Sequence, residues 1–201
     1  MVVNSITEFK NKKLKVCFDE GADLCLYKSE VRRLHLAVGE EIDCDRYNAI
    51  VEEILVPRAK SRAMHLLEKQ DRTEADLRNK LRESGYDDDV AEMAIDFVKS
   101  FGYIDDLRYA SNYVHFHQDK KSRRALMNAL AGKGISADII SQALEDEYDT
   151  DESAQIRAIL EKRHYNFEDA TYEERAKQMR YLLSKGYGID AVRRALGGAI
   201  E

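Results

Sequence analysis

The sequence has 201 residues, of which 44% are hydrophobic and 35% charged, with one proline, no tryptophan and a formal net charge of −6. This composition is typical of a globular helical protein, and the acidic balance argues against a simple nucleic-acid coat, whose affinity comes from Lys and Arg. The chain opens without a basic and then apolar leader and contains no apolar run of about 18 residues, so we expect a cytoplasmic protein that does not enter a membrane.

The first 57 residues combine short strands with helices. Within residues 5–28, apolar side chains alternate with polar or small ones at Leu14, Val16 and Phe18, and Gly21 offers a turn before a second apolar run. A sheet of two or three strands is marginal alone. We therefore expect the helical segments 29–35 and 45–56 to cover its apolar face.

Pro57 is the best candidate for a domain boundary. Proline disfavours helix at the residue before it, and the pattern of the sequence changes here. After Pro57, apolar residues recur three and four positions apart, as on one face of a helix. The rest of the chain is therefore predicted to be helical.

The helical part contains an internal repeat. Three segments of 23 residues align without gaps, at offsets of 49 and 52 residues. The copies are TEADLRNKLRESGYDDDVAEMAI at 73–95, SRRALMNALAGKGISADIISQAL at 122–144 and ERAKQMRYLLSKGYGIDAVRRAL at 174–196. Such periods are the signature of stacked helical units.

Each copy reads as two helices joined at a glycine. The glycines are Gly85, Gly134 and Gly186. A glycine at the end of a helix adopts the left-handed conformation at little cost, and the next apolar residue folds back onto the last turn. Those next residues are Tyr86, Ile135 and Tyr187. Asp87 and Ser136 then fit the N-cap of the second helix, where their side chains can accept hydrogen bonds from free amides.

Another apolar stripe precedes each copy and predicts a third helix. The stripes are Ala59, Ala63, Leu66 and Leu67, then Leu107, Ala110, Tyr113, Val114 and His117, then Ile156, Ile159, Leu160 and Arg163. We expect a mainly α fold: three tandem three-helix repeats in an elongated curved array, behind a small α+β domain with a β-hairpin or meander. The predicted domains are 1–57, 58–107, 108–150 and 151–201.

Several motifs that suggest chemistry have simpler explanations. His115 and His117 are two apart on a helix, so they face different sides and cannot share a metal ion. The run of aspartates from Asp87 lacks the other ligands of a calcium loop and fits helix capping better. Three cysteines, at 17, 25 and 44, follow no zinc or disulfide spacing. We expect no active site, no metal and no cofactor.

Basic side chains are the remaining candidates for a binding surface. Acidic residues outnumber basic ones in 1–107 and balance them in 108–201, so we expect positive surface in the C-terminal half. The candidate contact residues are Arg78, Arg82, Arg108, Lys120, Lys121, Arg123, Arg124, Arg193 and Arg194. A solvated helix face is the default interpretation of each cluster, although tyrosines lie between these charges and the pair of Tyr and Arg is enriched at protein–protein hot spots.

One part of the repeat resembles a known family. The stretch from Leu77 through Lys80-Leu81 to Gly85, followed by Gly-Tyr-Ile-Asp-Asp-Leu-Arg-Tyr-Ala at 102–110, is similar to the signature of the RecX family. Two degenerate copies follow in the order that this family has. The resemblance covers roughly residues 58–197.

This resemblance implies a negative modulator of RecA. Such a protein binds the RecA filament, with single-stranded DNA inside that filament, and limits its extension, ATPase activity and strand exchange, and with them DNA repair, recombination and the SOS response. It is not an enzyme, and we expect a monomer. Because the chain is acidic, we expect contacts mainly with the protein surface of the filament. The alternative is a stand-alone nucleic-acid-binding helical module.

Overall fold

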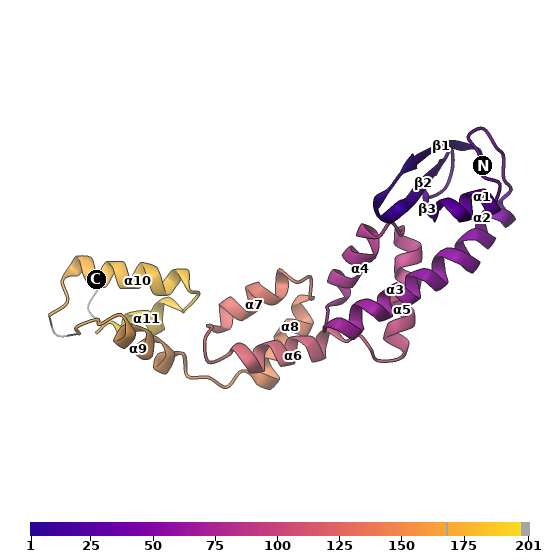
Figure 1. The fold of residues 1–201 in the computed structure, drawn as a ribbon. Coiled ribbons are helices and arrows are strands. Elements are labelled where there is room, and N and C mark those ends of the chain that lie inside the picture. The colour runs from indigo at the N-terminus through magenta and orange to yellow at the C-terminus, as the bar shows by residue number, and fades with distance from the viewer. Residues whose placement is uncertain (168, 198–201) are drawn as a thin grey trace. The chain divides into compact units, whose positions relative to one another are not determined.

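The computed structural model describes residues 1–167 and 169–197 and divides the chain into two compact units, 1–105 and 106–201 (Figure 1). The first unit begins with an antiparallel sheet in the order β1-β2-β3. Its strands are β1 (Val3–Glu8), β2 (Lys13–Phe18) and β3 (Leu24–Tyr27), with a 3₁₀ turn, η1 (Lys10–Lys12), between the first two. The predicted strand-bearing N-terminal region is therefore confirmed.

Helices complete the first unit. They are α1 (Lys28–Arg33), α2 (Cys44–Ile50), the π-helical turn η2 (Val51–Leu55), α3 (Val56–Lys69), α4 (Glu74–Glu83) and α5 (Asp88–Ser100). One continuous hydrophobic core joins the sheet to these helices, since Leu24 and Leu26 of β3 belong to the same buried cluster as Ala59, Leu77 and Leu81. The sheet is thus not a separate body beside the first repeat.

Pro57 does not interrupt the helix, and the expectation that helical structure breaks there is wrong. Residues 44–69 are helical throughout. Immediately before the proline, the Val56 amide donates to the Val51 carbonyl, five residues back. This wide π turn accommodates a residue that has no amide of its own, because a proline inside a regular helix would remove a hydrogen bond and clash with the preceding turn.

The second unit contains two groups of three helices. The first group is α6 (Asp106–His117), α7 (Arg123–Ala131) and α8 (Ala137–Glu147), and the second is α9 (Glu152–Lys162), α10 (Tyr172–Ser184) and α11 (Ile189–Ala195). Each group has its own buried cluster, around Leu126 and Leu130 in one and around Leu160 and Leu182 in the other. The mainly helical fold class is confirmed, while the predicted boundaries at 57, 107 and 150 remain proposals.

The repeated glycines end their helices as predicted. Gly85, Gly134 and Gly186 have φ angles of 90°, 80° and 88°. The residue after each glycine folds back, and its amide donates to the helix, as from Tyr86 to Leu81 and from Tyr187 to Leu182, both at 3.2 Å. The N-caps are less uniform. Asp87 accepts from the Val90 amide, whereas the Ser136 side chain makes no capping bond.

Two of these glycines also mark close contacts. A Cβ atom at Gly85 would lie 2.7 Å from the sulfur of Cys25 in β3, and one at Gly186 would lie 2.8 Å from Oγ of Ser122 at the start of α7. The carbonyl just before each glycine also accepts a hydrogen bond from the part of the fold packed there: Ser84 from Nζ of Lys13 in the sheet at 2.9 Å, and Lys185 from Ser122 Oγ at 2.8 Å. The helix end is therefore also a docking point.

We predict that Gly186→Ser lowers the free energy of unfolding by about 1–3 kcal/mol. A side chain costs about 1–2 kcal/mol in the left-handed conformation, and the contact with Ser122 adds to this. Gly188→Ser is the matched control, because Gly188 has a φ of −67° at the N-cap of α11 and open space around it. The control should leave stability unchanged or raise it by a few tenths of a kcal/mol. Urea unfolding followed by circular dichroism measures both, and equal losses would contradict the docking role.

Candidate functional site

The nine predicted contact residues fall on both units. Arg78 and Arg82 lie on α4 of the first unit. The second unit holds Arg108 on α6, Lys120 and Lys121 between α6 and α7, Arg123 and Arg124 at the start of α7, and Arg193 and Arg194 on α11. Some of these side chains are held by partners within the fold, and others are exposed to solvent.

Arg78 is a structural cation. Its guanidinium forms a two-pronged ion pair with Glu92 on α5 and a further one with Glu74, at 2.8 Å. These partners raise the pKa of Arg78, Glu92 first and Glu74 second. The neighbouring Arg82 pairs with Asp88 at 2.5 Å, and this contact lowers the pKa of that carboxyl. Both arginines therefore tie α4 to the start of α5.

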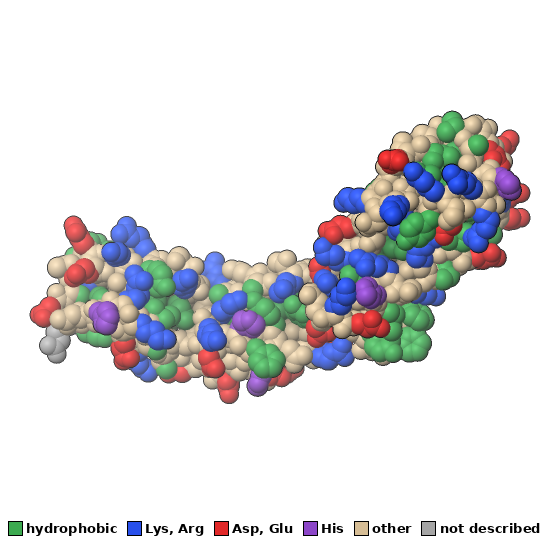
Figure 2. All heavy atoms as spheres, viewed as in Figure 1, with side chains coloured by type: hydrophobic (Ala, Val, Ile, Leu, Met, Phe, Trp, Pro, Cys, Tyr) green, Lys and Arg blue, Asp and Glu red, His purple; other side chains and the backbone are tan. Residues whose placement is uncertain are grey.

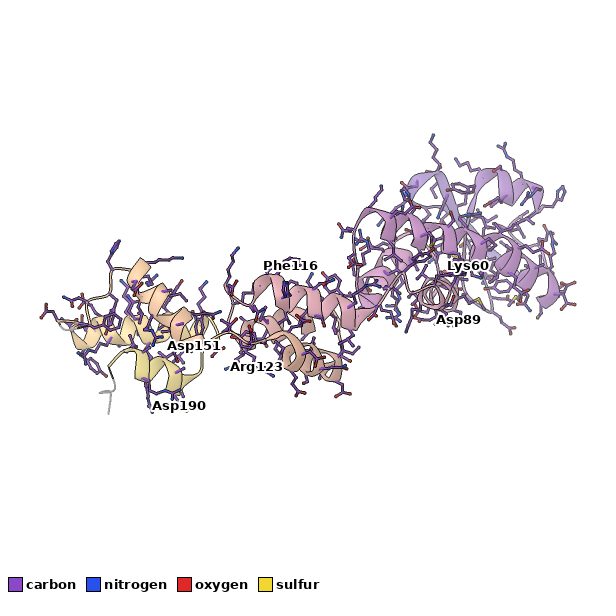
Figure 3. The ribbon with its side chains drawn as sticks, turned by 90° about the horizontal axis from the view of Figure 1, so that it is seen from below. Lys60, Asp89, Phe116, Arg123, Asp151 and Asp190 are labelled. Carbon is purple, nitrogen blue, oxygen red and sulfur yellow. The ribbon has the colours of Figure 1, made fainter. Side chains whose placement is uncertain are left out.

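Arg123 is also held within the fold. Its backbone amide donates to Glu152 at 2.8 Å, and its guanidinium donates to the Leu144 carbonyl at 3.1 Å. The guanidinium carbon lies 5.8 Å from the ring centroid of Tyr148. Figure 3 shows Arg123 and Asp151, at the starts of α7 and α9, on neighbouring parts of the second unit. Arg123 thus links the two helix groups.

Lys121 faces back onto α6. Its ammonium donates to the Tyr113 hydroxyl at 2.5 Å and lies 4.9 Å from the centroid of the same ring. Tyr113 is in turn stacked on His117, with ring centroids 4.2 Å apart. His117 of the predicted α6 stripe therefore packs against Tyr113, while His115 is exposed. No group of three or more metal-ligating side chains occurs within residues 1–167 and 169–197.

The remaining cations are open to solvent. Lys120, Arg124, Arg193 and Arg194 are exposed, and their side chains make no hydrogen bond or ion pair with the described residues. Arg108, also exposed, has a partner within the fold. Lys120 lines a groove, which we call the repeat groove, between the α6–α7 turn and the third repeat.

The repeat groove is basic and aromatic. Its lining consists of Lys120, Lys121, Ser122, Ala125, Ile159, Tyr181, Ser184, Lys185 and Tyr187. Three of these residues are lysines and none is acidic. At its edge, the guanidinium of Arg163 lies 4.0 Å from the Tyr181 ring centroid, with Lys185 at 5.5 Å on the same ring. Arg163, which the sequence predicts as part of the apolar stripe of α9, instead follows the helix and is exposed.

A buried chain of polar contacts supports the floor of the groove. The Tyr187 hydroxyl donates to Gln155 at 3.0 Å, and the Gln155 amide donates to the carbonyl of Gln118 after α6. Burial is the main cause of the raised pKa of Tyr187, so the hydroxyl remains protonated and can donate. Together with the bond from Ser122 to Lys185, these contacts fix the two walls of the repeat groove against each other.

One wall of this groove was predictable from the sequence and the other was not. Lys120 and Lys121 were recognisable as a cluster, and Tyr181 as an aromatic residue near basic ones. For Lys185, the sequence offers only its position before a repeated glycine, which does not predict a place in a binding groove. Its place in the groove depends on how the third repeat docks on the second, which no local pattern specifies.

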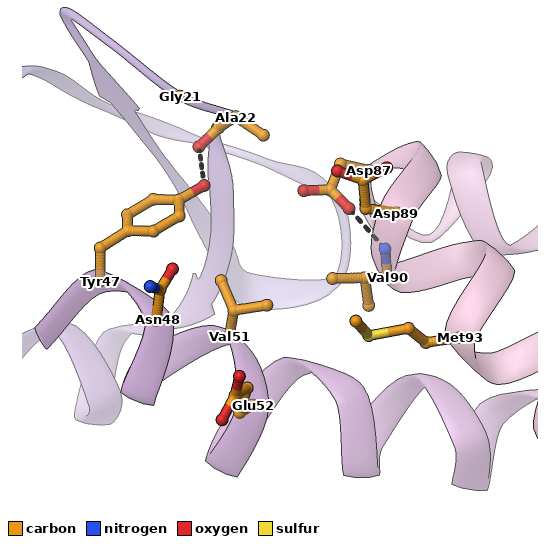
Figure 4. Close-up of a pocket in the computed structure, with 10 residues that line it drawn as sticks. All are labelled: Gly21, Ala22, Tyr47, Asn48, Val51, Glu52, Asp87, Asp89, Val90 and Met93. Carbon is orange, nitrogen blue, oxygen red and sulfur yellow. Dashed lines mark hydrogen bonds between the residues drawn. The ribbon is translucent and has the colours of Figure 1, made fainter. Parts of the chain in front are cut away.

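A second hollow lies in the first unit and has the opposite charge (Figure 4). Glu52, Asp87 and Asp89 line it, together with Tyr47, whose hydroxyl donates to the Ala22 carbonyl at 2.8 Å. Asp87 accepts from the Val90 amide at 2.8 Å. The aspartate run at 87–89 thus begins α5 as a helix cap, in agreement with the sequence-based interpretation.

We predict that Arg78→Gln destabilises the protein by roughly 1 kcal/mol at neutral pH, a value discounted for partial exposure. Hydrogen bonds from Lys99 and Arg78 lower the pKa of Glu74, and one from Arg78 lowers that of Glu92, from an ordinary value of 4.5. A lowered carboxyl pKa stabilises the folded state above the ordinary value and ceases to do so as pH falls through the folded value.

The difference in stability between wild type and Arg78→Gln should therefore shrink as pH drops below about 4. Urea unfolding at a series of pH values measures it. Lys80→Gln, on the same helix, removes an exposed pair with Glu83 and is the control that should change stability less. A difference that grows toward low pH would contradict the structural role of Arg78.

Comparison with known proteins places all three helical repeats in one family. The model described as the first three-helix domain of RecX matches residues 59–97, the second matches 105–144 and the third matches 150–196. No described helix combines the length and the apolar character that crossing a membrane requires.

Curated relatives support the same family assignment. The regulatory protein RecX of Clostridium tetani is 30% identical over 203 residues, covering 96% of this chain and 94% of the relative. That of Clostridium perfringens strain 13 is 33% identical over 153 residues, covering 74% of this chain and 72% of the relative.

Two crystal structures share the fold, each at 23% identity. One, of a regulatory protein RecX, has a TM-score of 0.66 and covers 98% of this chain and 99% of its own. The other, of RecX from Lactobacillus salivarius, has a TM-score of 0.63 and covers 71% and 94%. From the order of its three repeats and its similarity to these relatives, the chain belongs to the RecX family of regulatory proteins.

Proposed function

We propose that the protein is a negative modulator of the RecA recombinase. It acts in the cytoplasm as a monomer, binds the filament that RecA forms on single-stranded DNA, and limits filament extension, ATPase activity and strand exchange. It thereby restrains recombination, DNA repair and the SOS response. The observation that carries this proposal is the match of all three repeats, in order, to the RecX family.

The repeat groove is the proposed contact with the filament. Tyrosine and arginine side chains are enriched at protein–protein hot spots, and Tyr181 with Arg163 forms such a pair at the edge of the groove. The lysines of the lining can meet carboxylates of a protein surface or phosphates of the enclosed DNA. Arg124, beside the lining residue Ala125 at the start of α7, adds exposed charge next to the groove, and Arg193 and Arg194 provide it elsewhere in the second unit.

The predicted contact residues differ in how free their side chains are to bind a partner. Arg78, Arg82 and Arg123 have intramolecular partners, and a partner surface would have to replace these bonds. An exposed cation without a partner loses nothing within the fold when it binds. We therefore assign the main filament contacts to Lys120 and Arg124, with several weaker contacts along the repeats adding avidity.

We predict that Lys120→Glu loses most of the effect on RecA. The wild-type protein, titrated into RecA on single-stranded DNA, should lower the ATPase rate and shorten filaments seen by electron microscopy. Lys120→Glu should need a roughly tenfold higher concentration for the same inhibition, the loss expected for about 1.4 kcal/mol of binding free energy. The lysine side chain is exposed, so the variant should fold.

Arg157→Glu is the matched control. Arg157 is exposed on α9, lies two residues from Ile159 and therefore faces away from the groove. Among the described residues, its side chain forms only a long 3.8 Å ion pair with Asp151. It changes the net charge equally and should inhibit RecA like the wild type. If the wild-type protein leaves the ATPase rate and filament length unchanged, the proposed function is wrong; equal losses in both variants would reject the groove as the contact.

A further inference from the structure

Lys13 on β2 is a buried cation without an acidic partner. Only 7% of the residue is exposed. Its ammonium donates to the Ser84 carbonyl at 2.9 Å and lies 4.9 Å from the ring centroid of Tyr86 and 5.8 Å from that of Tyr27. No carboxylate of the described residues forms an ion pair with it. Within the described residues, a carbonyl and two aromatic rings are the direct contacts of its ammonium group.

Such a charge is unusual, because buried charges are normally paired. The neighbouring groups balance it only in part. Burial and the Arg58 guanidinium lower the pKa of the Lys13 ammonium, and Arg62 contributes in the same direction, whereas Cys25 and Glu30 raise it. Arg58 pairs with Glu30 and lies 4.8 Å from the Tyr27 ring centroid. Arg62 forms no hydrogen bond or ion pair with any described residue.

These cations converge on one pocket of the first unit, which we call the Lys13 pocket. It is lined by Asn11, Lys13, Tyr27, Arg58, Ser61, Arg62, His65, Ser84 and Tyr86. No acidic residue lines it, in contrast to the hollow shown in Figure 4. Figure 2 shows Lys and Arg side chains gathered over the sheet and the helices beside it. The expectation that positive surface lies in the C-terminal half fails here.

Four of the lining residues come from a single face of α3. Arg58, Ser61, Arg62 and His65 are three and four residues apart, so they point to the same side of the helix. The strand β2 supplies Lys13 and the end of α4 supplies Ser84. The pocket is therefore built where the sheet docks on the first repeat, and its walls belong to one hydrophobic core.

We propose that the Lys13 pocket binds a phosphate group of a nucleotide unit, with Lys13, Arg58 and Arg62 around the phosphate oxygens. A phosphate carries more charge and more acceptor oxygens than a carboxylate, and guanidinium groups bind it in a two-pronged geometry. Tyr27, with 40% of its surface exposed, offers an aromatic face on which a base can stack. This combination favours a nucleotide over an acidic peptide.

The binding site is independent of the proposed action on RecA. It needs no partner protein, and it gives the N-terminal region a role of its own. It can therefore be tested without RecA, so that its failure leaves the proposed function untouched. Removing residues 1–57 is a poor test, because the cut would expose the core that the sheet shares with α3 and α4.

The test uses the full chain and a fluorescent oligothymidylate of about 15 nucleotides, with binding followed by anisotropy over a range of salt concentrations. The decisive variant is Arg62→Gln, because this half-buried side chain has no partner whose loss would disturb the fold. Lys13→Met is the second variant, with folding checked by circular dichroism. Lys60→Gln is the matched control: it lies on the opposite side of α3, over the Phe97 ring at 5.0 Å (Figure 3).

We expect the wild type to bind the oligonucleotide at low salt. Loss of one phosphate contact should reduce the slope of log affinity against log salt by about 0.7, which corresponds to roughly eightfold weaker binding near 50 mM salt. Arg62→Gln and Lys13→Met should show this loss, and Lys60→Gln should keep the wild-type slope. Absence of wild-type binding, or equal slopes in all four proteins, would overturn the proposal.

Two competitors identify the source of the phosphate. Competition by ATP with the same dependence on Arg62 supports the phosphate site and assigns it to a free nucleotide. Failure of ATP to compete, together with the variant effects above, supports the site and assigns it to a polynucleotide. Displacement of the oligonucleotide by polyglutamate at equal charge concentration would overturn the choice of phosphate and assign the pocket to an acidic protein segment.

Discussion

The packing within each unit depends on one small contact. In it, the carbonyl at the end of a helix accepts a hydrogen bond from the part of the fold that packs against that end. The final carbonyls of any helix lack intrahelical partners. At Ser84 and at Lys185, the glycine that follows turns the chain sharply and leaves no Cβ in the way. At Gly85 the space is taken by Cys25 of the sheet, whose neighbouring strand supplies the donor Lys13, and at Gly186 it is taken by the donor Ser122 itself. One residue type thus ends the helix, exposes an acceptor and lets the neighbouring part of the fold approach.

This contact explains where the two basic pockets lie. Ser84 and Tyr86 flank the glycine in the first unit and line the Lys13 pocket, while Lys185 and Tyr187 flank the corresponding glycine and line the repeat groove. A docked module cannot fill the space around a sharp turn completely, so a hollow remains beside it. Tyrosine after the glycine supplies an aromatic wall in both cases. Under the proposed function, repetition of the helix end would also repeat a binding surface.

Most of the fold was predictable from the sequence, because it depends on local chemistry. The left-handed glycines, the residue that folds back after each one and the helical stripes such as Ala59 and Ala63 all follow from short-range rules. A break in the helix was predicted at Pro57. The helix instead continues, because a π turn, which has no sequence signature, accommodates the proline. The candidate site was predictable only in part. Charge alone cannot distinguish Arg78, which is held by two glutamates, from Arg124, which faces solvent, since that difference depends on tertiary packing.

The Gln118, Gln155 and Tyr187 contacts have a consequence for how the second unit opens. Gln155 is buried and its amide group bridges the end of α6 to Tyr187, in the turn before α11. If the group of α6, α7 and α8 unfolded alone, this amide would lose its Gln118 partner, and a buried amide left without a partner costs about 1–3 kcal/mol. Repeat proteins usually tolerate fraying of a terminal repeat. Here Gln155 couples the two groups together with the Ser122–Lys185 and Arg123–Glu152 hydrogen bonds, so that they should open as one cooperative unit.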